Sequence, residues 1–230
     1  MVNILDIDVE INKEKILKNL KFIENTEGYK NAGEIFDELA LLIRENMNLI
    51  SMYSIADNRG EFPLGKDMSE EIQKIVLCFL SSNNNINSMV NDFINEGAYL
   101  KGYLLNEMAA HVIFNSSNEM NKVIKKKLLD LGYILTKKYA PGDAGLELRY
   151  QKIILDTFKK YVHIDAYLTE NYMLVPEKSM MYFFGAKKVG ANCDLCKLQL
   201  IEDNYLNFHN GSDESCIDCN KLNCQYRKLI

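Results

Sequence analysis

The 230-residue sequence lacks the patterns of several common protein classes. No basic amino-terminal segment precedes an apolar core, so we expect no secretory signal. No apolar run approaches the roughly 20 residues that span a bilayer. The net charge is −5, and no basic stripe is interleaved with aromatic residues, which argues against nucleic-acid binding. We therefore expect a cytoplasmic protein that has neither a membrane nor a nucleic acid as its partner.

The sequence also lacks the familiar motifs of nucleotide binding and hydrolysis. It contains no Gly-x-Gly-x-x-Gly after a strand, no phosphate-binding loop ending in Gly-Lys-Ser/Thr, no Gly-x-Ser-x-Gly and no His-Glu-x-x-His. The carboxylates of Asp165 and Glu170 would lie on opposite faces of a strand, so they do not form a pair for acid–base chemistry. The residues alone therefore identify no enzyme.

The composition is that of a globular protein. Of all residues, 47% are hydrophobic and 26% are charged, which suits one core with a small appendage. We predict an α+β fold, in which a mixed or antiparallel sheet carries helices on one face and a small C-terminal cysteine-rich metal-binding tail follows. No Pro- or Gly-rich linker divides the chain before residue 188, and residues 189–192 are the best candidate hinge. The predicted domains are residues 1–188 and 189–230.

Hydrophobic periodicity predicts the elements of the first half. Asn12 is the type of residue that caps a helix, and it precedes an apolar stripe with helical spacing. The apolar run Ile75–Leu80 favours a buried strand over a helix, with Cys78 as a small core residue. In chain order we expect an edge strand over 4–11, helices over 13–24 and 32–47, strands over 49–56 and 75–80, and a helical region over 86–131 that breaks near Gly97 or around 115–117.

The second half is organised around a bend. A β-rich run ends at Pro141-Gly142, where proline fixes the backbone φ and glycine permits conformations closed to other residues. We expect this bend to be exposed. It is followed by a predicted helix over 146–161 and by two predicted strands over 166–173 and 179–187.

Several stretches within residues 132–187 resemble a known family. The chain is similar there to the activation domain of cobalamin-dependent (vitamin B12-dependent) methionine synthase, and most of all to its stand-alone relatives in anaerobic bacteria. The N-terminal half fits that family by order and pattern, as with Ile7-Asp8 ahead of the first helix. The matching stretches are Tyr139-Ala140-Pro141-Gly142, Leu146-Glu147, Gln151, Leu168-Thr169-Glu170-Asn171-Tyr172-Met173 and Pro176-Glu177-Lys178-Ser179.

The resemblance implies a function. In that family an Arg-x-x-x-Gly-Tyr turn holds S-adenosylmethionine, largely through backbone groups, and the domain closes over a corrinoid on a partner module. This chain would accordingly be an accessory activation protein for a corrinoid-dependent methyltransferase, binding S-adenosylmethionine for reductive remethylation of the corrinoid, with the chemistry carried by the cofactors. No residue of the chain would be catalytic, and the implied ligand-binding residues are Lys138, Tyr139, Ala140, Pro141 and Gly142.

Two residues depart from the family turn. Lys138 stands where the family has Arg, which keeps the positive charge but loses the planar two-pronged donor that grips a carboxylate. Asp143 stands where the family has Tyr, which removes a ring and adds a negative charge. Contacts made by the backbone do not depend on either side chain.

The tail carries the strongest spacing signal. Cys193-x-x-Cys196 and Cys216-x-x-Cys219 form two knuckles, and Cys224 follows. Two knuckles complete a tetrahedral set of thiolates, which suits Zn²⁺ or an iron–sulfur cluster. Disulfides are not expected in the cytoplasm.

The sequence leaves the metal and part of the function open. The close spacing of Cys216, Cys219 and Cys224 resembles tails on the stand-alone relatives and slightly favours a [4Fe-4S] cluster over zinc, with unmetallated thiols as a third alternative. The metal is either a redox centre or a purely structural staple. Two alternatives to the activation protein stay open: a non-catalytic partner-binding module with a decayed ligand site and a structural zinc tail, and a stand-alone iron–sulfur redox protein.

Overall fold

The structure is a computed structural model that describes residues 1–8, 11–63, 71–143 and 145–189. The predicted metal ligands Cys193, Cys196, Cys216, Cys219 and Cys224, and all but the first residue of the predicted hinge, lie outside the described residues. The predicted division into two domains and the predicted metal site therefore stay predictions.

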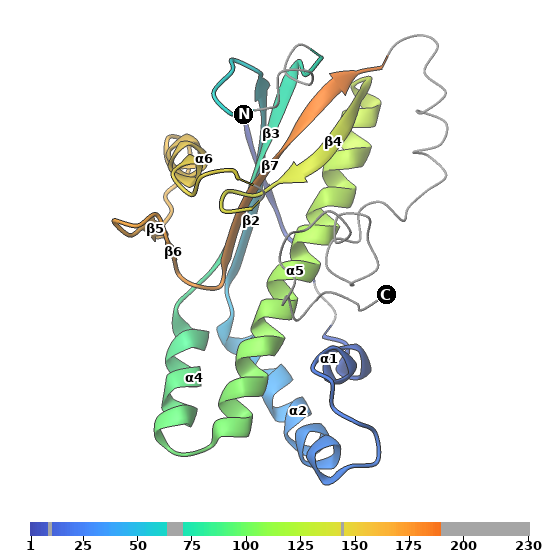
Figure 1. Cartoon of the computed structure of the whole chain (residues 1–230), viewed down its shortest axis with the longest axis vertical. Coiled ribbons are helices and arrows are strands. Elements are labelled where there is room, and N and C mark those ends of the chain that lie inside the picture. Colours follow the sequence, from blue (N-terminus) through green and yellow to red (C-terminus); the bar gives the residue numbers. More distant parts are fainter. Residues whose placement is uncertain (9–10, 64–70, 144, 190–230) are drawn as a thin grey trace.

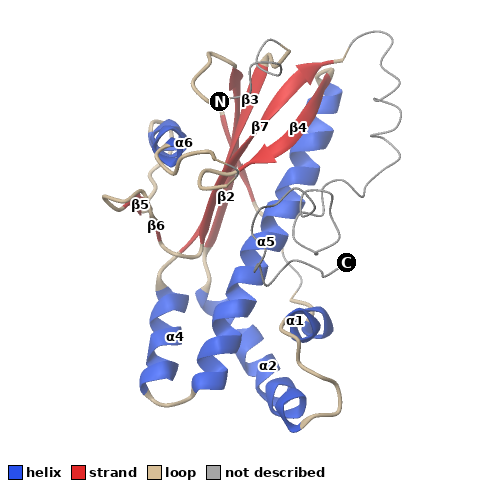
Figure 2. Cartoon of the chain, in the orientation of Figure 1, coloured by secondary structure: helices blue, strands red, loops and turns tan. Residues whose placement is uncertain are grey.

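A five-stranded sheet forms the body of the molecule (Figures 1 and 2). Every neighbouring pair of its strands is antiparallel, and β1 and β4 are its edges. This confirms the predicted α+β class. In spatial order the strands are β1 (Val2–Leu5), β2 (Leu49–Asp57), β3 (Lys74–Ser82), β7 (Ser179–Lys188) and β4 (Tyr133–Tyr139).

Helices lie on both faces of the sheet and extend beyond one end of it (Figure 1). The helices are α1 (Lys13–Asn19), α2 (Glu27–Asn46), α4 (Asn85–Asn95), α5 (Tyr99–Asp130) and α6 (Tyr150–Lys159), and a two-stranded hairpin is made of β5 (Tyr167–Leu168) and β6 (Leu174–Val175). Within the described residues, no helix combines the length and the apolar character needed to cross a membrane.

The helices that the sequence predicted on one face of the sheet account for that face alone, because α6 covers the other face. Side chains of β3 alternate between two cores, because successive residues of a strand point to opposite faces. Cys78 packs with Ile124 of α5 on one face, whereas Phe79 packs with Phe158 of α6 on the other. Burial on both faces is the physical reason why the run Ile75–Leu80 is continuously apolar.

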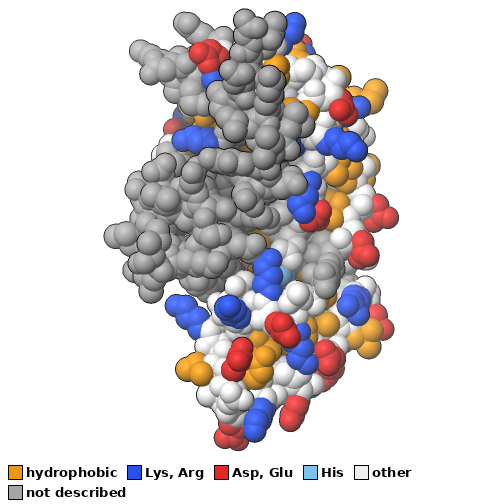
Figure 3. Space-filling view, turned by 90° about the vertical axis from the view of Figure 1, so that its right-hand side faces the viewer, with side chains coloured by type: hydrophobic (Ala, Val, Ile, Leu, Met, Phe, Trp, Pro, Cys, Tyr) orange, Lys and Arg blue, Asp and Glu red, His pale blue; other side chains and the backbone are white. Residues whose placement is uncertain are grey.

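A third core lies in an arm made of α1, α2, α4 and the first half of α5. It is filled by Phe36 and Leu39 of α2 and by Leu104 and Met108 of α5, all essentially inaccessible to solvent. The helical region breaks at Gly97, where φ is +80°, and not at residues 115–117, which continue α5. On the side of the molecule shown in Figure 3, acidic and basic side chains are interspersed over the described lower part.

Several predicted boundaries are corrected. Asn12 caps α1 as predicted, accepting a hydrogen bond from the backbone N–H of Lys15, but the helix ends at Asn19 because Lys21 takes a left-handed φ of +59°. The helix predicted from residue 146 begins only at Tyr150. The strand predicted over 166–173 is reduced to the two residues of β5, since the chain turns back after Leu168.

Candidate functional site

The predicted ligand-binding residues lie at the end of β4, directly after an irregularity in its pairing with β7. Leu135 pairs with Ala186 and Lys138 pairs with Phe184, so Thr136 and Lys137 together oppose Gly185. This is a β-bulge, in which one strand carries an extra residue. It sets the direction of every side chain that follows in β4.

Lys138 points to the face of the sheet that α5 covers. Its Nζ lies 4.1 Å from the centroid of the Tyr182 ring and 3.7 Å from Sδ of Met180. Such a contact with a ring face is a cation–π interaction. Burial lowers the pKa of Lys138 to about 8, and the nearby groups Cys78 and Asp143 oppose that shift only in part.

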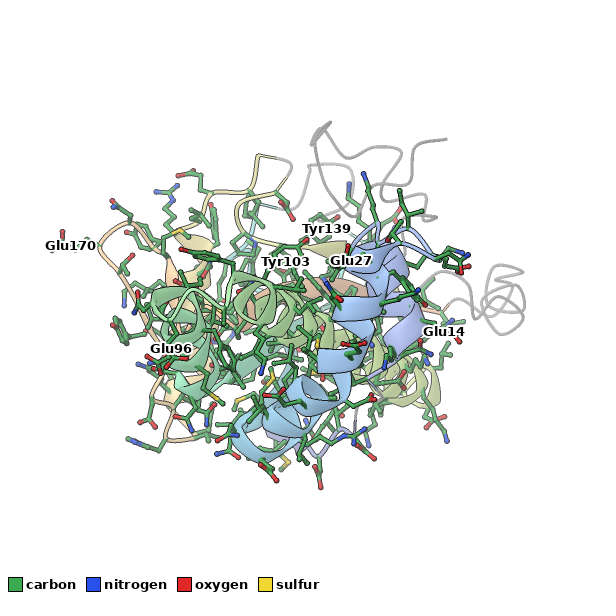
Figure 4. The ribbon with its side chains drawn as sticks, turned by 90° about the horizontal axis from the view of Figure 1, so that it is seen from below. Glu14, Glu27, Glu96, Tyr103, Tyr139 and Glu170 are labelled. Atoms are coloured by element: carbon green, nitrogen blue, oxygen red, sulfur yellow. The ribbon has the colours of Figure 1, made fainter. Side chains whose placement is uncertain are left out.

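Tyr139 points to the opposite face, towards the α6 core. Its ring stacks on Phe183 with the centroids 5.2 Å apart, and the Nζ of Lys137 lies 5.5 Å from the centroid of the Tyr139 ring. Burial raises the pKa of Tyr139. Seen from below, Tyr139 lies far from Glu170, which stands at the tip of the β5–β6 hairpin (Figure 4). The stacked rings of Tyr139 and Phe183 therefore make the end of β4 next to the bend aromatic.

The bend itself is a tight turn between Ala140 and Leu146. The backbone N–H of Asp143 donates to the carbonyl of Ala140 at 3.0 Å, and that of Gly142 donates to the carbonyl of Leu146 at 2.7 Å. Gly142 has a φ of +95°, the conformation that the sequence predicted for this glycine, and a Cβ there would lie 3.0 Å from Leu148. Pro141 is buried, whereas Gly142 and Asp143 are exposed as predicted.

These hydrogen bonds decide which backbone groups the bend can offer to a ligand. The N–H groups of Gly142 and Asp143 are used inside the turn, and Pro141 has no N–H. No hydrogen bond within the described part of the chain takes up the carbonyl of Pro141 or of Gly142. The bend therefore offers backbone carbonyls that can accept hydrogen bonds from amino groups of a ligand. It offers fewer backbone N–H groups that could donate to a carboxylate.

The sequence did not predict the buried polar side chains that lie beneath Lys138. The hydroxyl of Tyr182 donates to Oδ1 of Asn121 on α5 at 2.8 Å, and Cys78 lies beside it on β3. Burial raises the pKa values of the Tyr182 hydroxyl and the Cys78 thiol, so both stay protonated at neutral pH. The signal available in the sequence was Asn121, a polar residue at the helical spacing of the apolar positions of α5.

The histidines and acidic residues of the described chain form no metal centre. Among those residues, no group of three or more His, Cys, Asp or Glu side chains converges. His111 is partly buried and hydrogen-bonds to Asn115 at 2.8 Å, and burial lowers its pKa to about 4. His163 is exposed and lies 3.1 Å from Asp165.

The fold is an α+β domain with an antiparallel sheet and one long helix, α5, on one of its faces. The edge strand β4 of this sheet leads into the Pro-Gly bend. Among solved structures, the chain is similar to the reactivation domain of MetH bound to AdoHcy, with a TM-score of 0.58, 10% sequence identity, and coverage of 84% of this chain and 80% of that chain. At this identity the likeness is one of fold. No protein-family model matches the sequence, and no curated protein does.

Proposed function

We propose that this chain is an activation module that binds S-adenosylmethionine at residues 138–142, where β4 leads into the bend, and serves a corrinoid-dependent methyltransferase. The observation that carries the proposal is the shared fold with a domain whose structure holds AdoHcy. The bend after β4, where Gly142 is exposed, supports it. The role is accessory, and the corrinoid would be held by the partner.

Each residue of the bend has a proposed part in binding. S-adenosylmethionine would supply an activated methyl group attached to a sulfonium. The carbonyls of Pro141 and Gly142 would accept hydrogen bonds from amino groups of the ligand, because they carry no hydrogen bond within the described part of the chain. Tyr139 and Ala140 would provide the apolar side of the site. Lys138, whose ammonium lies against Tyr182 on the opposite face of the sheet, would contribute positive charge without touching the ligand's carboxylate.

The cysteine tail is proposed to hold a metal through Cys193, Cys196, Cys216, Cys219 and Cys224. A [4Fe-4S] cluster there would deliver the electron that reductive remethylation needs, whereas zinc would only stabilise the tail. Metal analysis and the visible spectrum of anaerobically purified protein distinguish the two.

A second candidate function is a partner-binding module without a ligand. It is favoured by one observation: the N–H groups of Gly142 and Asp143 are consumed inside the turn. In this case the bend would be a rigid surface feature, and neither S-adenosylmethionine nor AdoHcy would bind.

Titration calorimetry of the full chain with S-adenosylmethionine and with AdoHcy tests the proposal. Wild type is expected to bind, and Gly142→Ala is expected to weaken binding about tenfold, because the new Cβ meets Leu148 and strains the left-handed backbone. Gly132→Ala is the matched control, since it has a φ of +78° with nothing within 4 Å and lies at the far end of β4. No heat from folded wild type at millimolar ligand would refute the proposal in favour of the second candidate.

A further inference from the structure

The bulge in β4 decides which way the residues of the bend face. In an antiparallel pair, opposed residues point to the same face, and a shift of one residue reverses every side chain beyond it. If the pairing of Leu135 with Ala186 continued without a bulge, Tyr139 would oppose Tyr182 and point to the α5 face. With the bulge, Tyr139 opposes Phe183 and points to the α6 face.

The side chain of Thr136 forms hydrogen bonds at the bulge, where the regular pairing of β4 with β7 is interrupted. Oγ1 of Thr136 accepts a hydrogen bond from the backbone N–H of Gly185 at 2.9 Å, in place of a carbonyl of β4. The same hydroxyl donates to the carbonyl of Lys137 at 3.1 Å. Thr136 thereby joins both strands across the irregular step.

Gly185, the residue of β7 opposite the bulge, has no room for a side chain. A Cβ on this residue would lie 2.6 Å from Cδ1 of Ile72, which packs on the α6 face of the sheet. Glycine is therefore favoured at the position of β7 that Thr136 contacts.

We propose that Thr136 is a positioning residue of the ligand site, because its hydroxyl holds the bulge that places Lys138 over Tyr182 and Tyr139 against Phe183. It acts through these two residues and the bend that follows them, without touching the ligand. The inference rests on the proposed function, since it concerns the same site.

The test compares Thr136→Val, which keeps the branched shape and removes the hydroxyl, with Thr136→Ser, which keeps the hydroxyl. Thr136→Val is expected to weaken AdoHcy binding about tenfold in calorimetry of the full chain. It is also expected to accelerate hydrogen exchange at the amide of Gly185, which loses its acceptor. Thr136→Ser is expected to restore both within about twofold.

Thr157→Val is the matched control. Thr157 lies in α6, and its hydroxyl donates to the carbonyl of Ile153 at 2.7 Å. Its loss is expected to leave AdoHcy affinity unchanged. Wild-type affinity in folded Thr136→Val would overturn the inference while leaving the proposed function intact, whereas absence of binding in wild type would refute both.

Discussion

At the scale of single residues, burial of Lys138 disfavours its charged form. Its ammonium lies against a ring and a thioether, and burial lowers its pKa from 10.5 to about 8. Below pH 8 both the folded and the unfolded chain carry the proton. Between pH 8 and 10.5 the unfolded chain binds more protons at this residue, so the free energy of unfolding rises with pH in this window.

The prediction that follows concerns Lys138→Met. Methionine fills a similar volume beside Met180 without a charge, so the variant is expected to be more stable than wild type at pH 7.5, by about 1–3 kcal/mol. Urea unfolding at pH 7.5 and pH 9.5 measures this, and the difference between the two proteins is expected to shrink at the higher pH. A less stable variant would mean that the cation–π contact outweighs the cost of burial.

Residue chemistry was predictable where one residue type is needed. The cap at Asn12 and the bend at Pro141-Gly142 both follow from local rules that name the residue. The bulge was not predictable, because Lys137 and Lys138 are alike and give no alternation that would reveal the extra residue. The ligand-binding role of residues 138–142 stays a prediction.

At the scale of elements, α1 depends on its cap. It has only 7 residues, and the Asn12 side chain accepts from the N–H of Lys15 at 2.9 Å. Asn12→Ala is expected to lower the free energy of unfolding by about 1 kcal/mol, because a first-turn N–H loses its partner. Thermal or urea unfolding measures the loss.

Asn12→Asp serves as the control for the cap. Aspartate keeps the acceptor and adds a charge that the helix dipole favours, so it is expected to match wild type. Equal stability of Asn12→Ala and wild type would show that the cap contributes nothing to α1.

No face of the sheet was predicted for α6, although the sequence indicated that both faces are covered. A continuous apolar strand such as Ile75–Leu80 is typical of burial on both faces, which requires cover on both. The helix itself was predicted, but periodicity shows only which of its sides is apolar and not which face of the sheet receives that side. Tertiary packing decides the latter.

At the scale of the whole molecule, the arm and the sheet body have separate cores. Leu39 is fully buried in the arm, whereas the proposed ligand site lies at the end of β4 in the body. Leu39→Ala is expected to lower the free energy of unfolding by about 2–5 kcal/mol. Hydrogen exchange should increase in α2, while folded protein keeps its affinity for AdoHcy.

Ile154→Ala is the counterpart in the body. Ile154 is fully buried in α6, and its truncation is expected to increase exchange in α6 and β3 instead of α2. Loss of AdoHcy affinity in folded Leu39→Ala would contradict the separation and make the arm part of the site.

Helix α5 belongs to both parts, and this has a mechanical consequence. Its 32 residues make a rod of roughly 48 Å that packs in the arm at one end and under the sheet at the other (Figure 1). Turning one part against the other would require bending that rod. A protein that binds the arm would therefore hold the end of β4 at a fixed angle to itself.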